Sequence, residues 1–210
     1  NLLPKTGAMC GIDLNLLELV NDSDGSAFEN RRFREDAEHA IMKQQRALSR
    51  KVEAAKREGR TLAASRNYQK QRIKLAQTHR LIARQRQDYL NVISKHMVEN
   101  QDLIAAENLK VRNLLKNHCL AKTISDAGWR MLLTMLQQKA VMYGKAVILV
   151  PPQYTTQTCS HCGHILLGAS MLPLSVREWT CPECGAYHLR DKNAAQNILN
   201  KALKILAQQS

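Results

Sequence analysis

Residues 9–20 read MCGIDLNLLELV, and their alternation of apolar and polar side chains predicts a β-strand. Ile12 and Leu14 would lie on one face of this strand, with Asp13 and Asn15 on the other. An acid in the middle of such a strand is unusual, because carboxylates are seldom buried without a partner. The stretch therefore predicts a strand of a sheet and marks Asp13 as a candidate functional residue.

Helices and strands are expected on the C-terminal side of this stretch. The turn residues NDSDG at 21–25 predict a hairpin into a second strand. The further expected elements are helices over about 34–59 and 65–98, strands over 102–109 and 146–150, a helix from Ser125 as N-cap to Tyr143, and a helix over 191–207. The two long helices are expected to pair antiparallel. This order predicts a mixed α/β fold with insertions.

The positive charge of the chain is concentrated in one segment. The whole chain has a net charge of +13 and a pI near 9.7. Residues 43–86 hold 14 Lys and Arg but only two acids, a net charge of +12, whereas residues 1–42 hold four bases and eight acids. A solvated helix face usually mixes both signs of charge. The segment is therefore predicted to bind nucleic acid, with Arg46, Lys70 and Arg72 as candidate phosphate contacts.

The composition excludes a protein that crosses a membrane through a helix. Hydrophobic residues make up 44% and charged residues 23% of the 210 residues, which is ordinary for one globular domain or two small ones. The longest strongly apolar run, residues 146–150, is too short to span a bilayer. The N-terminus shows no secretory pattern, so no membrane partner is expected.

Four of the six cysteines form two Cys-x-x-Cys pairs that are separated by 18 residues, namely Cys159, Cys162, Cys181 and Cys184. Each pair is followed by glycine, which allows the backbone to turn around a bound ion. Without an export signal, a metal site is favoured over a disulfide framework. Four thiolates suit tetrahedral Zn²⁺, so a zinc ribbon with a structural ion is predicted. Cys10 and Cys119 lack such spacing and are expected to be buried thiols.

The aromatic and histidine residues around these pairs allow more than one interpretation. Tyr154, Trp179 and Tyr187 either pack the small core of the ribbon or stack on bases of a nucleic acid. His161 and His164 flank the first pair and are expected to be exposed rather than to bind the metal.

Two further acids complete a candidate catalytic site with Asp13. Glu107 ends the apolar strand over 102–109, and Asp191 opens the last helix on the stripe that faces the sheet. Each has an ordinary explanation, Glu107 as a strand-end acid and Asp191 as a favourable charge at a helix N-terminus. Together, however, they offer the hard oxygen ligands of two-metal phosphodiester hydrolysis, so Mg²⁺ or Mn²⁺ is the predicted catalytic cofactor. Arg190 beside Asp191 is predicted either to position a phosphate or to form a surface ion pair.

Five motifs resemble, in the same order, the C-terminal half of TnpB (OrfB) proteins, which are insertion-sequence-encoded relatives of type V CRISPR nucleases. The motifs are GIDL at 11–14, ENLKV at 107–111, LAKTISDAGW at 120–129, REWTCPECG at 177–185 and RDKNAA at 190–195. The resemblance covers nearly the whole chain from about residue 8, and the correctly spaced ribbon makes it highly specific.

The resemblance implies a RuvC-like nuclease of the ribonuclease H fold, in which Asp13, Glu107 and Asp191 hold the catalytic metals. The implied activity is RNA-guided cleavage of a DNA target in the cytoplasm of a prokaryote, near the nucleoid, with the guide RNA transcribed from the transposon end. The implied domains are a nuclease core over 8–154 with a helical insertion at about 34–98, a target-nucleic-acid-binding zinc ribbon over 155–188, and a final core helix over 189–210.

Departures from the family pattern leave two alternatives open. Asn15, Asn108 and Leu189 replace the usual Gly, Asp and Asp beside the three acids, so a catalytically weak or inactive guided DNA-binding protein is the first alternative. The chain also begins twelve residues before Asp13, where family members have an N-terminal half that grips the guide and the target duplex. A truncated transposon remnant is therefore the second alternative, and guide binding is expected to need that half. The sequence gives no indication of an oligomeric state.

Overall fold

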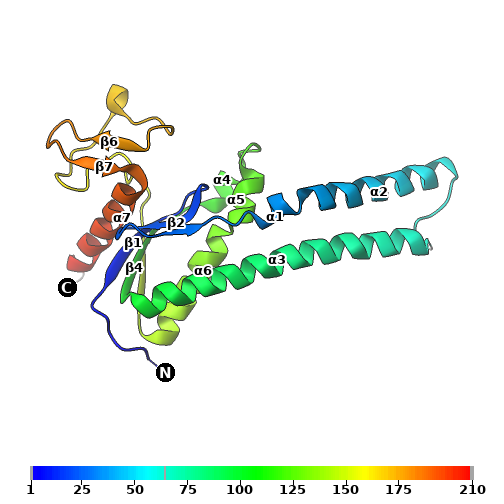
Figure 1. Cartoon of the computed structure of the whole chain (residues 1–210), viewed down its shortest axis with the longest axis horizontal. Helices are drawn as coiled ribbons and strands as arrows, with labels where there is room; N and C mark the ends of the chain where they lie inside the picture. Colours follow the sequence, from blue (N-terminus) through cyan, green and yellow to red (C-terminus); the bar gives the residue numbers. More distant parts are fainter. Residues whose placement is uncertain (1, 64, 209–210) are drawn as a thin grey trace. The chain divides into compact units, whose positions relative to one another are not determined.

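A computed structural model describes residues 2–63 and 65–208, and the chain divides into two compact units. The sheet unit consists of the residues up to Arg31 and from Leu90 onward, and the helical unit is Arg32–Tyr89. Figure 1 shows the elements of both units in chain order. Among the described residues, no helix is long and apolar enough to cross a membrane.

The sheet unit is built on a five-stranded mixed sheet with the order β3-β2-β1-β4-β5. The strands are β1 (Met9–Asp13), β2 (Glu18–Asp22), β3 (Ala27–Glu29), β4 (Leu103–Glu107) and β5 (Ala146–Val150). β2 runs antiparallel to its two neighbours, β1 and β3, whereas β4 pairs in parallel with both β1 and β5. This sheet, with helices packed on it, confirms the predicted mixed α/β fold of the ribonuclease H type.

The single strand expected over 9–20 is wrong, because the chain reverses within it. β1 ends at Asp13, and β2 returns antiparallel from Glu18. The Oδ1 atom of Asn15 accepts hydrogen bonds from the backbone N–H groups of Leu17 and Glu18, at 3.0 and 2.9 Å. These bonds close an Asx turn, which the continuing apolar alternation concealed. The second hairpin, expected at 21–25, is confirmed by the antiparallel pairing of β2 and β3.

Helix α7 (Arg190–Ala207) packs on β1 at very short range (Figure 1). A Cβ atom placed on Gly11 would lie 1.9 Å from the carbonyl oxygen of Ala195 and 2.7 Å from the backbone nitrogen of Leu199. Only glycine leaves room for this approach. The contact continues into a core of residues from α7, β4 and β5, namely Leu103, Ala105, Val150, Ile198, Leu199 and Ala202.

Three more helices belong to the sheet unit: α4 (Val111–Leu114), α5 (Ala121–Ala127) and α6 (Trp129–Tyr143). Ser125 lies inside α5 and is therefore not the expected N-cap of a longer helix. Gly128, with φ of 69°, ends α5 and starts α6, because its left-handed backbone redirects the chain. Gly144, with φ of 70°, ends α6 as expected.

The helical unit is an antiparallel helix pair, as expected. It contains α1 (Phe33–Asp36), α2 (Glu38–Arg57) and the part of α3 (Arg66–Asn100) that precedes Leu90. Figure 1 shows α2 and α3 side by side, and the Nε2 atom of Gln44 donates a hydrogen bond to the Oγ1 atom of Thr78 across them, at 3.0 Å. Buried Ile41, Ala55 and Ile82 recur at helical spacing on the facing sides.

The remaining elements lie in the cysteine module, which is residues 155–188, or extend just beyond it. Strands β6 (Glu178–Thr180) and β7 (Tyr187–Leu189) form an antiparallel pair, and a short 3₁₀ helix, η1 (Gly168–Ser170), lies between the two cysteine pairs. A small core of Cys159, Leu166, Trp179 and Cys181 fills the module.

Candidate active site and cysteine cluster

Asp13 and Glu107 end two neighbouring parallel strands. Ile12 of β1 pairs with Ala106 of β4, so the next residues of the two strands, Asp13 and Glu107, lie beside each other at one edge of the sheet. Both residues are buried, with exposed fractions of 7% and 8%. Two adjacent buried acids are unusual, and they form the floor of the candidate active site.

Asp191 joins these two acids from the first turn of α7. Burial, together with the negative charges of Glu107 and Asp191, raises the pKa of Asp13 to about 7. The structure therefore brings the three predicted acids into electrostatic range of one another. Among the described residues, only the cysteine cluster gathers three or more potential ligand atoms within 4.8 Å of one another.

Glu107 is held by two residues that the sequence analysis missed. The hydroxyl of Thr155 donates a hydrogen bond of 2.5 Å to the Oε1 atom of Glu107. Burial raises the pKa of Glu107, while the Thr155 hydrogen bond and the positive charge of Lys201 oppose this rise. Lys201 itself donates to the backbone carbonyls of Pro151 and Gln153, which keep its ammonium group in place. Neither residue belongs to a motif, so only the fold reveals these contacts.

The acid cluster fits a divalent cation. Burial is the largest cause of the raised pKa of Asp13, and the negative charges of Glu107 and Asp191 add to it; a bound cation would neutralise these charges. Carboxylate oxygens are the ligands that Mg²⁺ and Mn²⁺ prefer. Asp13, Glu107 and Asp191 are thus the residues that would hold such ions.

Arg177, rather than Arg190, forms the ion pair beside the site. The Nη1 atom of Arg177 lies 3.6 Å from the Oδ1 atom of Asp191. Arg190 is buried, and its Nη1 atom donates to the backbone carbonyls of Pro173 and Val176, at 2.7 and 3.3 Å. The surface ion pair considered for Arg190 is therefore wrong, and its role toward a phosphate stays a prediction.

A groove of about 440 Å³ opens beside Asp191. Its wall includes Asn21 of β2 on one side, and Arg177 and Lys192 on the other. The lining mixes three basic residues with four acidic ones, namely Arg177, Arg190 and Lys192 with Glu18, Asp22, Glu178 and Asp191, so the charge of the groove alone does not indicate an anionic substrate.

Amide side chains of α7 fasten the cysteine module to the helix that bears Asp191. Asn193 accepts a hydrogen bond from the backbone N–H of Ser160 at 2.9 Å and donates one to the carbonyl of Thr158 at 2.8 Å. Asn197 donates to the carbonyls of Thr155 and Thr158, at 2.9 and 2.6 Å. The cysteine module and the acid cluster are therefore connected through one helix.

The four sulfur atoms of the cysteine cluster lie within 4.8 Å of one another. The Sγ atoms of Cys159 and Cys184 are 3.7 Å apart, as are those of Cys162 and Cys181. Tetrahedral Zn²⁺ with Zn–S bonds of about 2.3 Å requires S–S distances of about 3.8 Å. The residues therefore fit a closed four-thiolate zinc site.

His188 is a neighbour of this cluster that the sequence analysis missed. Its Nε2 atom lies 3.0 Å from the Sγ atom of Cys159, and its ring lies against Trp179, with centroids 4.8 Å apart. Trp179 is buried and packs the core of the module, whereas Tyr154 and Tyr187 are exposed. The packing interpretation thus holds for the tryptophan alone.

The remaining cysteines and histidines differ in part from expectation. Cys10 is buried, and burial followed by the charges of Asp22 and Asp24 raises its pKa to about 12. Cys119 is exposed, so its expected burial is wrong, because it lies in the turn before α5 rather than in a packed element. Of the two histidines beside the first cysteine pair, His161 is exposed, as expected, whereas His164 is half-buried.

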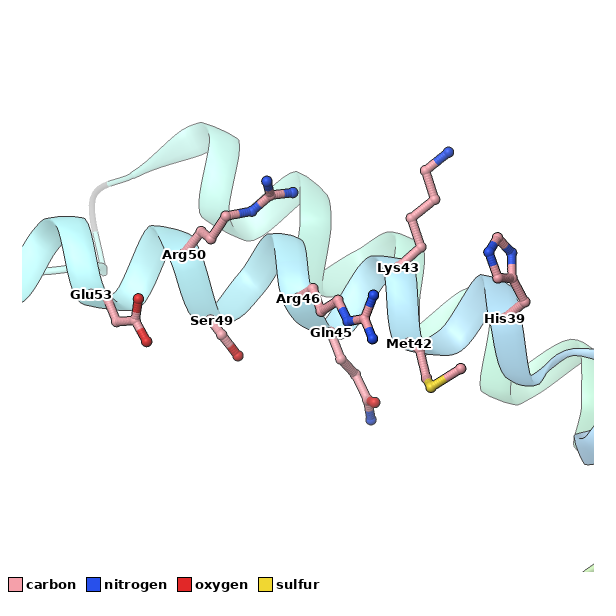
Figure 2. A pocket seen from close by; sticks show the side chains of 8 residues that line it. All are labelled: His39, Met42, Lys43, Gln45, Arg46, Ser49, Arg50 and Glu53. Carbon is pink, nitrogen blue, oxygen red and sulfur yellow. The ribbon is translucent and has the colours of Figure 1, made fainter.

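Basic side chains line the outer face of α2 in the helical unit. Figure 2 shows Lys43, Arg46 and Arg50 extending from successive turns of this helix, where they line a shallow pocket of about 650 Å³. Lys70 and Arg72 on α3 are also exposed. Contact with nucleic acid at these residues stays a prediction.

Two protein families match the chain. The OrfB_IS605 family, described as "Probable transposase", matches residues 3–118. The family described as "Cas12f1-like, TNB domain" matches residues 129–198.

Curated relatives align with nearly the whole chain. A "Putative RNA-guided DNA endonuclease" of Streptomyces pristinaespiralis is 38% identical over 201 residues, which cover 95% of this chain and 46% of that protein. The "Putative RNA-guided DNA endonuclease InsQ" of Escherichia coli (strain K12) is 32% identical over 217 residues, which cover 96% and 51%. The chain thus spans about half the length of the curated relatives it matches.

Two solved structures share the fold. The Cas12f1 chain of a complex with sgRNA and target DNA superposes with a TM-score of 0.58 at 17% identity, over 95% of this chain and 51% of that chain. A CRISPR-Cas12f ternary complex gives a TM-score of 0.60 at 16% identity, over 95% and 40%.

Proposed function

The chain belongs to the OrfB_IS605 transposase family, and on this basis we propose that it is the nuclease half of a TnpB-type RNA-guided DNA endonuclease. The observation on which the proposal depends is the meeting of Asp13, Glu107 and Asp191 at one edge of the sheet. The names of the Streptomyces and Escherichia relatives support a DNA endonuclease. The proposed site of action is DNA in the prokaryotic cytoplasm.

Each of the three acids is held in place in a different way for the proposed hydrolysis. Asp13 ends β1 and is buried beneath the site, while Glu107 is oriented by the hydroxyl of Thr155. Asp191 sits in the first turn of α7, and Arg177 balances its charge. Mg²⁺ or Mn²⁺, when bound to these carboxylates, supplies the Lewis acidity for phosphodiester hydrolysis.

The cysteine module is proposed to bind one structural Zn²⁺ and to contact the target nucleic acid. Its four thiolates complete the coordination of the ion, so no position is open for chemistry. Its role would be to present Arg177 and the groove beside Asp191 to the substrate strand. Asn193 supports this role, because its hydrogen bonds to the first cysteine pair fix the module on α7.

The proposed partners are target DNA and a guide RNA transcribed from the transposon end. The helical unit would follow a phosphate backbone through the basic face of α2 and α3, including Arg46, Lys70 and Arg72. Arg190, which is buried and whose positive charge lowers the pKa of Asp13, would help to position the phosphate beside Asp191. Binding of the guide is proposed to need residues beyond this chain, because the relatives are about twice as long.

The test is cleavage of labelled single-stranded DNA with Mg²⁺ or Mn²⁺, by this chain and by a version extended with the N-terminal half of a relative. We expect metal-dependent cleavage by the extended protein, and its loss in Asp13→Ala with guide-dependent DNA binding retained. Cleavage by Asp13→Ala at the wild-type rate would overturn the assignment of the catalytic acids.

A second candidate function is guided DNA binding without cleavage. Asn15, Asn108 and Leu189 favour it, because each lies within two residues of one of the three acids and departs from the resembled motif. The same experiment separates the two functions, since tight guided binding without cleavage at any metal concentration would support the second.

A further inference from the structure

A cavity of about 770 Å³ lies beside the end of β4, separate from the groove at Asp191. One of its walls is the segment that follows Glu107, with residues 108–113 and 115. The other wall is formed by four residues that are spaced by three or four along α6 and therefore share one face of this helix, namely Arg130, Leu133, Thr134 and Gln137. Its volume is typical of pockets that hold a ligand of small-molecule size.

The charged side chains of this cavity are all basic. Lys110, Arg112 and Arg130 line it, and no acidic residue does. All three are exposed, and none of them forms an ion pair within the described part of the chain. In the groove beside Asp191, by contrast, acids outnumber bases. Positive charges that are gathered without a counter-charge repel one another, so a bound anion would stabilise this arrangement.

The uncharged part of the lining combines leucines with carboxamides. Leu133 is buried and Leu149 is half-buried, whereas Asn113 and Gln137 are exposed. An apolar surface suits the flat face of a base, a carboxamide can pair with its edge, and cations suit its phosphates. A nucleotide with an unpaired base presents all of these groups together, whereas a duplex keeps its bases stacked inside.

The cavity lies at the same edge of the sheet as the acids. Asn108 follows Glu107 directly, and its backbone N–H donates to the carbonyl of Val150 at 2.8 Å. Leu149 pairs with Ala106, whereas Glu107, one residue further along β4, projects to the opposite face of the sheet. A strand that leaves the acids around the end of β4 would therefore enter the cavity.

We infer that this cavity binds one nucleotide of the single DNA strand that is cleaved, with its phosphates on the cations and its base on the leucines. The identity of the strand rests on the proposed nuclease function. Binding here would hold the strand beside Glu107 through residues that take no part in metal binding.

The first measurement is the affinity of the whole chain for a labelled single-stranded DNA oligonucleotide, without added Mg²⁺ or Mn²⁺, over a series of salt concentrations. Arg112→Gln with Arg130→Gln removes two charges from the cavity, whereas Lys116→Gln with Lys204→Gln removes two exposed charges outside it. All four side chains are exposed, so both double variants should fold.

We expect the arginine pair of variants to bind the oligonucleotide about tenfold more weakly than the wild type. It should also reduce the slope of log affinity against log salt by about 1.4, since each phosphate contact on a single strand contributes about 0.7. The lysine pair should bind as the wild type does. Equal losses in the two pairs, or no loss in the arginine pair, would overturn the inference.

The side-chain amides of α6 give a second readout that locates the ligand. Gln137 lines the cavity, whereas its neighbour Gln138 is exposed and does not. We expect a short thymidine oligonucleotide to shift the Gln137 amide signal in a ¹⁵N-correlated NMR spectrum and to leave the Gln138 signal in place. A Gln137 signal that does not respond at saturation would overturn the inference.

The type of strand decides the identity of the ligand. We expect the arginine pair to weaken the binding of single-stranded DNA more than that of RNA of the same sequence or of duplex DNA. A loss that is equal or larger with RNA would assign the cavity to an RNA strand, and one that is equal or larger with the duplex would exclude the unpaired base. Either result overturns the inference. Absence of cleavage by the extended wild type with Mg²⁺ or Mn²⁺ would instead overturn the proposed function and leave the single-strand site standing.

Discussion

The cysteine cluster and the acid cluster are both candidate metal sites, yet they are built in opposite ways. The four thiols come from two short local turns, and their sulfur atoms already lie within 4.8 Å of one another. The three acids come from β1, β4 and α7, and their mutual charge together with burial leaves Asp13 with a pKa of about 7. The first site depends on local backbone geometry and the second on tertiary packing. Metal removal or a substitution should therefore affect one cluster and leave the other intact.

Removal of zinc should have the largest effect, and it should fall on the cysteine cluster. Structural zinc in small modules contributes about 10–16 kcal/mol of apparent binding free energy at neutral pH. We expect about one zinc per chain, and loss of the fluorescence signal of packed Trp179 when a chelator removes it. Cys181→Ser should give the same result. A chain with less than about 0.2 zinc under reducing conditions would contradict the site.

Gly11→Ala should break the acid cluster and spare the cysteine cluster. The added Cβ atom would meet the backbone of α7 at 1.9 Å, so the helix must move away from β1. We expect a loss of at least about 3 kcal/mol in the free energy of unfolding and no Asp13-dependent Mn²⁺ binding. Zinc content should stay at the wild-type value. Denaturant unfolding and metal analysis provide the two measurements, and loss of both metals together would show that the sites are not separable.

The pH dependence of stability should identify the acid cluster. Because the folded pKa of Asp13 lies above that of an unfolded aspartate, the folded state binds the proton more tightly, and stability should fall as pH rises from about 4 to about 7. Asp13→Asn should remove this dependence and stabilise the metal-free protein by roughly 2 kcal/mol at pH 8. Unfolding curves at pH 5 and pH 8 test the sign, and a wild type that gains stability over this range relative to Asp13→Asn would contradict it.

Asn193→Ala should have the smallest effect on stability. It should weaken the attachment of the cysteine module to α7, the helix that bears Asp191. It removes two hydrogen bonds between α7 and the first cysteine pair, for a loss of about 1–2 kcal/mol. We expect both metals to bind, with faster hydrogen exchange in residues 155–160. Unchanged exchange there would show that Asn197 alone fastens the module.

The two clusters also differ in how far the sequence could predict them. Spacing alone gave the cysteine ligands, because a Cys-x-x-Cys turn determines its own geometry. The acids could be proposed from their elements, but Thr155 and Lys201 beside Glu107 could not, because their contacts depend on the path of the chain after β5. Arg177 was missed for the same reason, since its pairing with Asp191 depends on how the module docks.

The sequence predicted an element well where its apolar pattern stops at a clear boundary, and poorly where the pattern continues through a turn. The strand at 146–150 and the long helices agree with the structure, since each is flanked by glycine, proline or turn residues. The turn at Asn15 was missed, because leucines on both sides continue the alternation through it. The reversal of the chain depends on hydrogen bonds to the Oδ1 atom of Asn15, and the apolar pattern carries no information about them.

Gly11 also has a consequence for inheritance. Every missense change of a glycine codon introduces a side chain, and any side chain at this position meets the backbone of α7. Only silent mutations are therefore compatible with the docked helix, whereas a gene copy drifting without selection has no reason to keep this codon. Counting silent against missense changes at this codon among related copies of the gene would separate working copies from decaying ones.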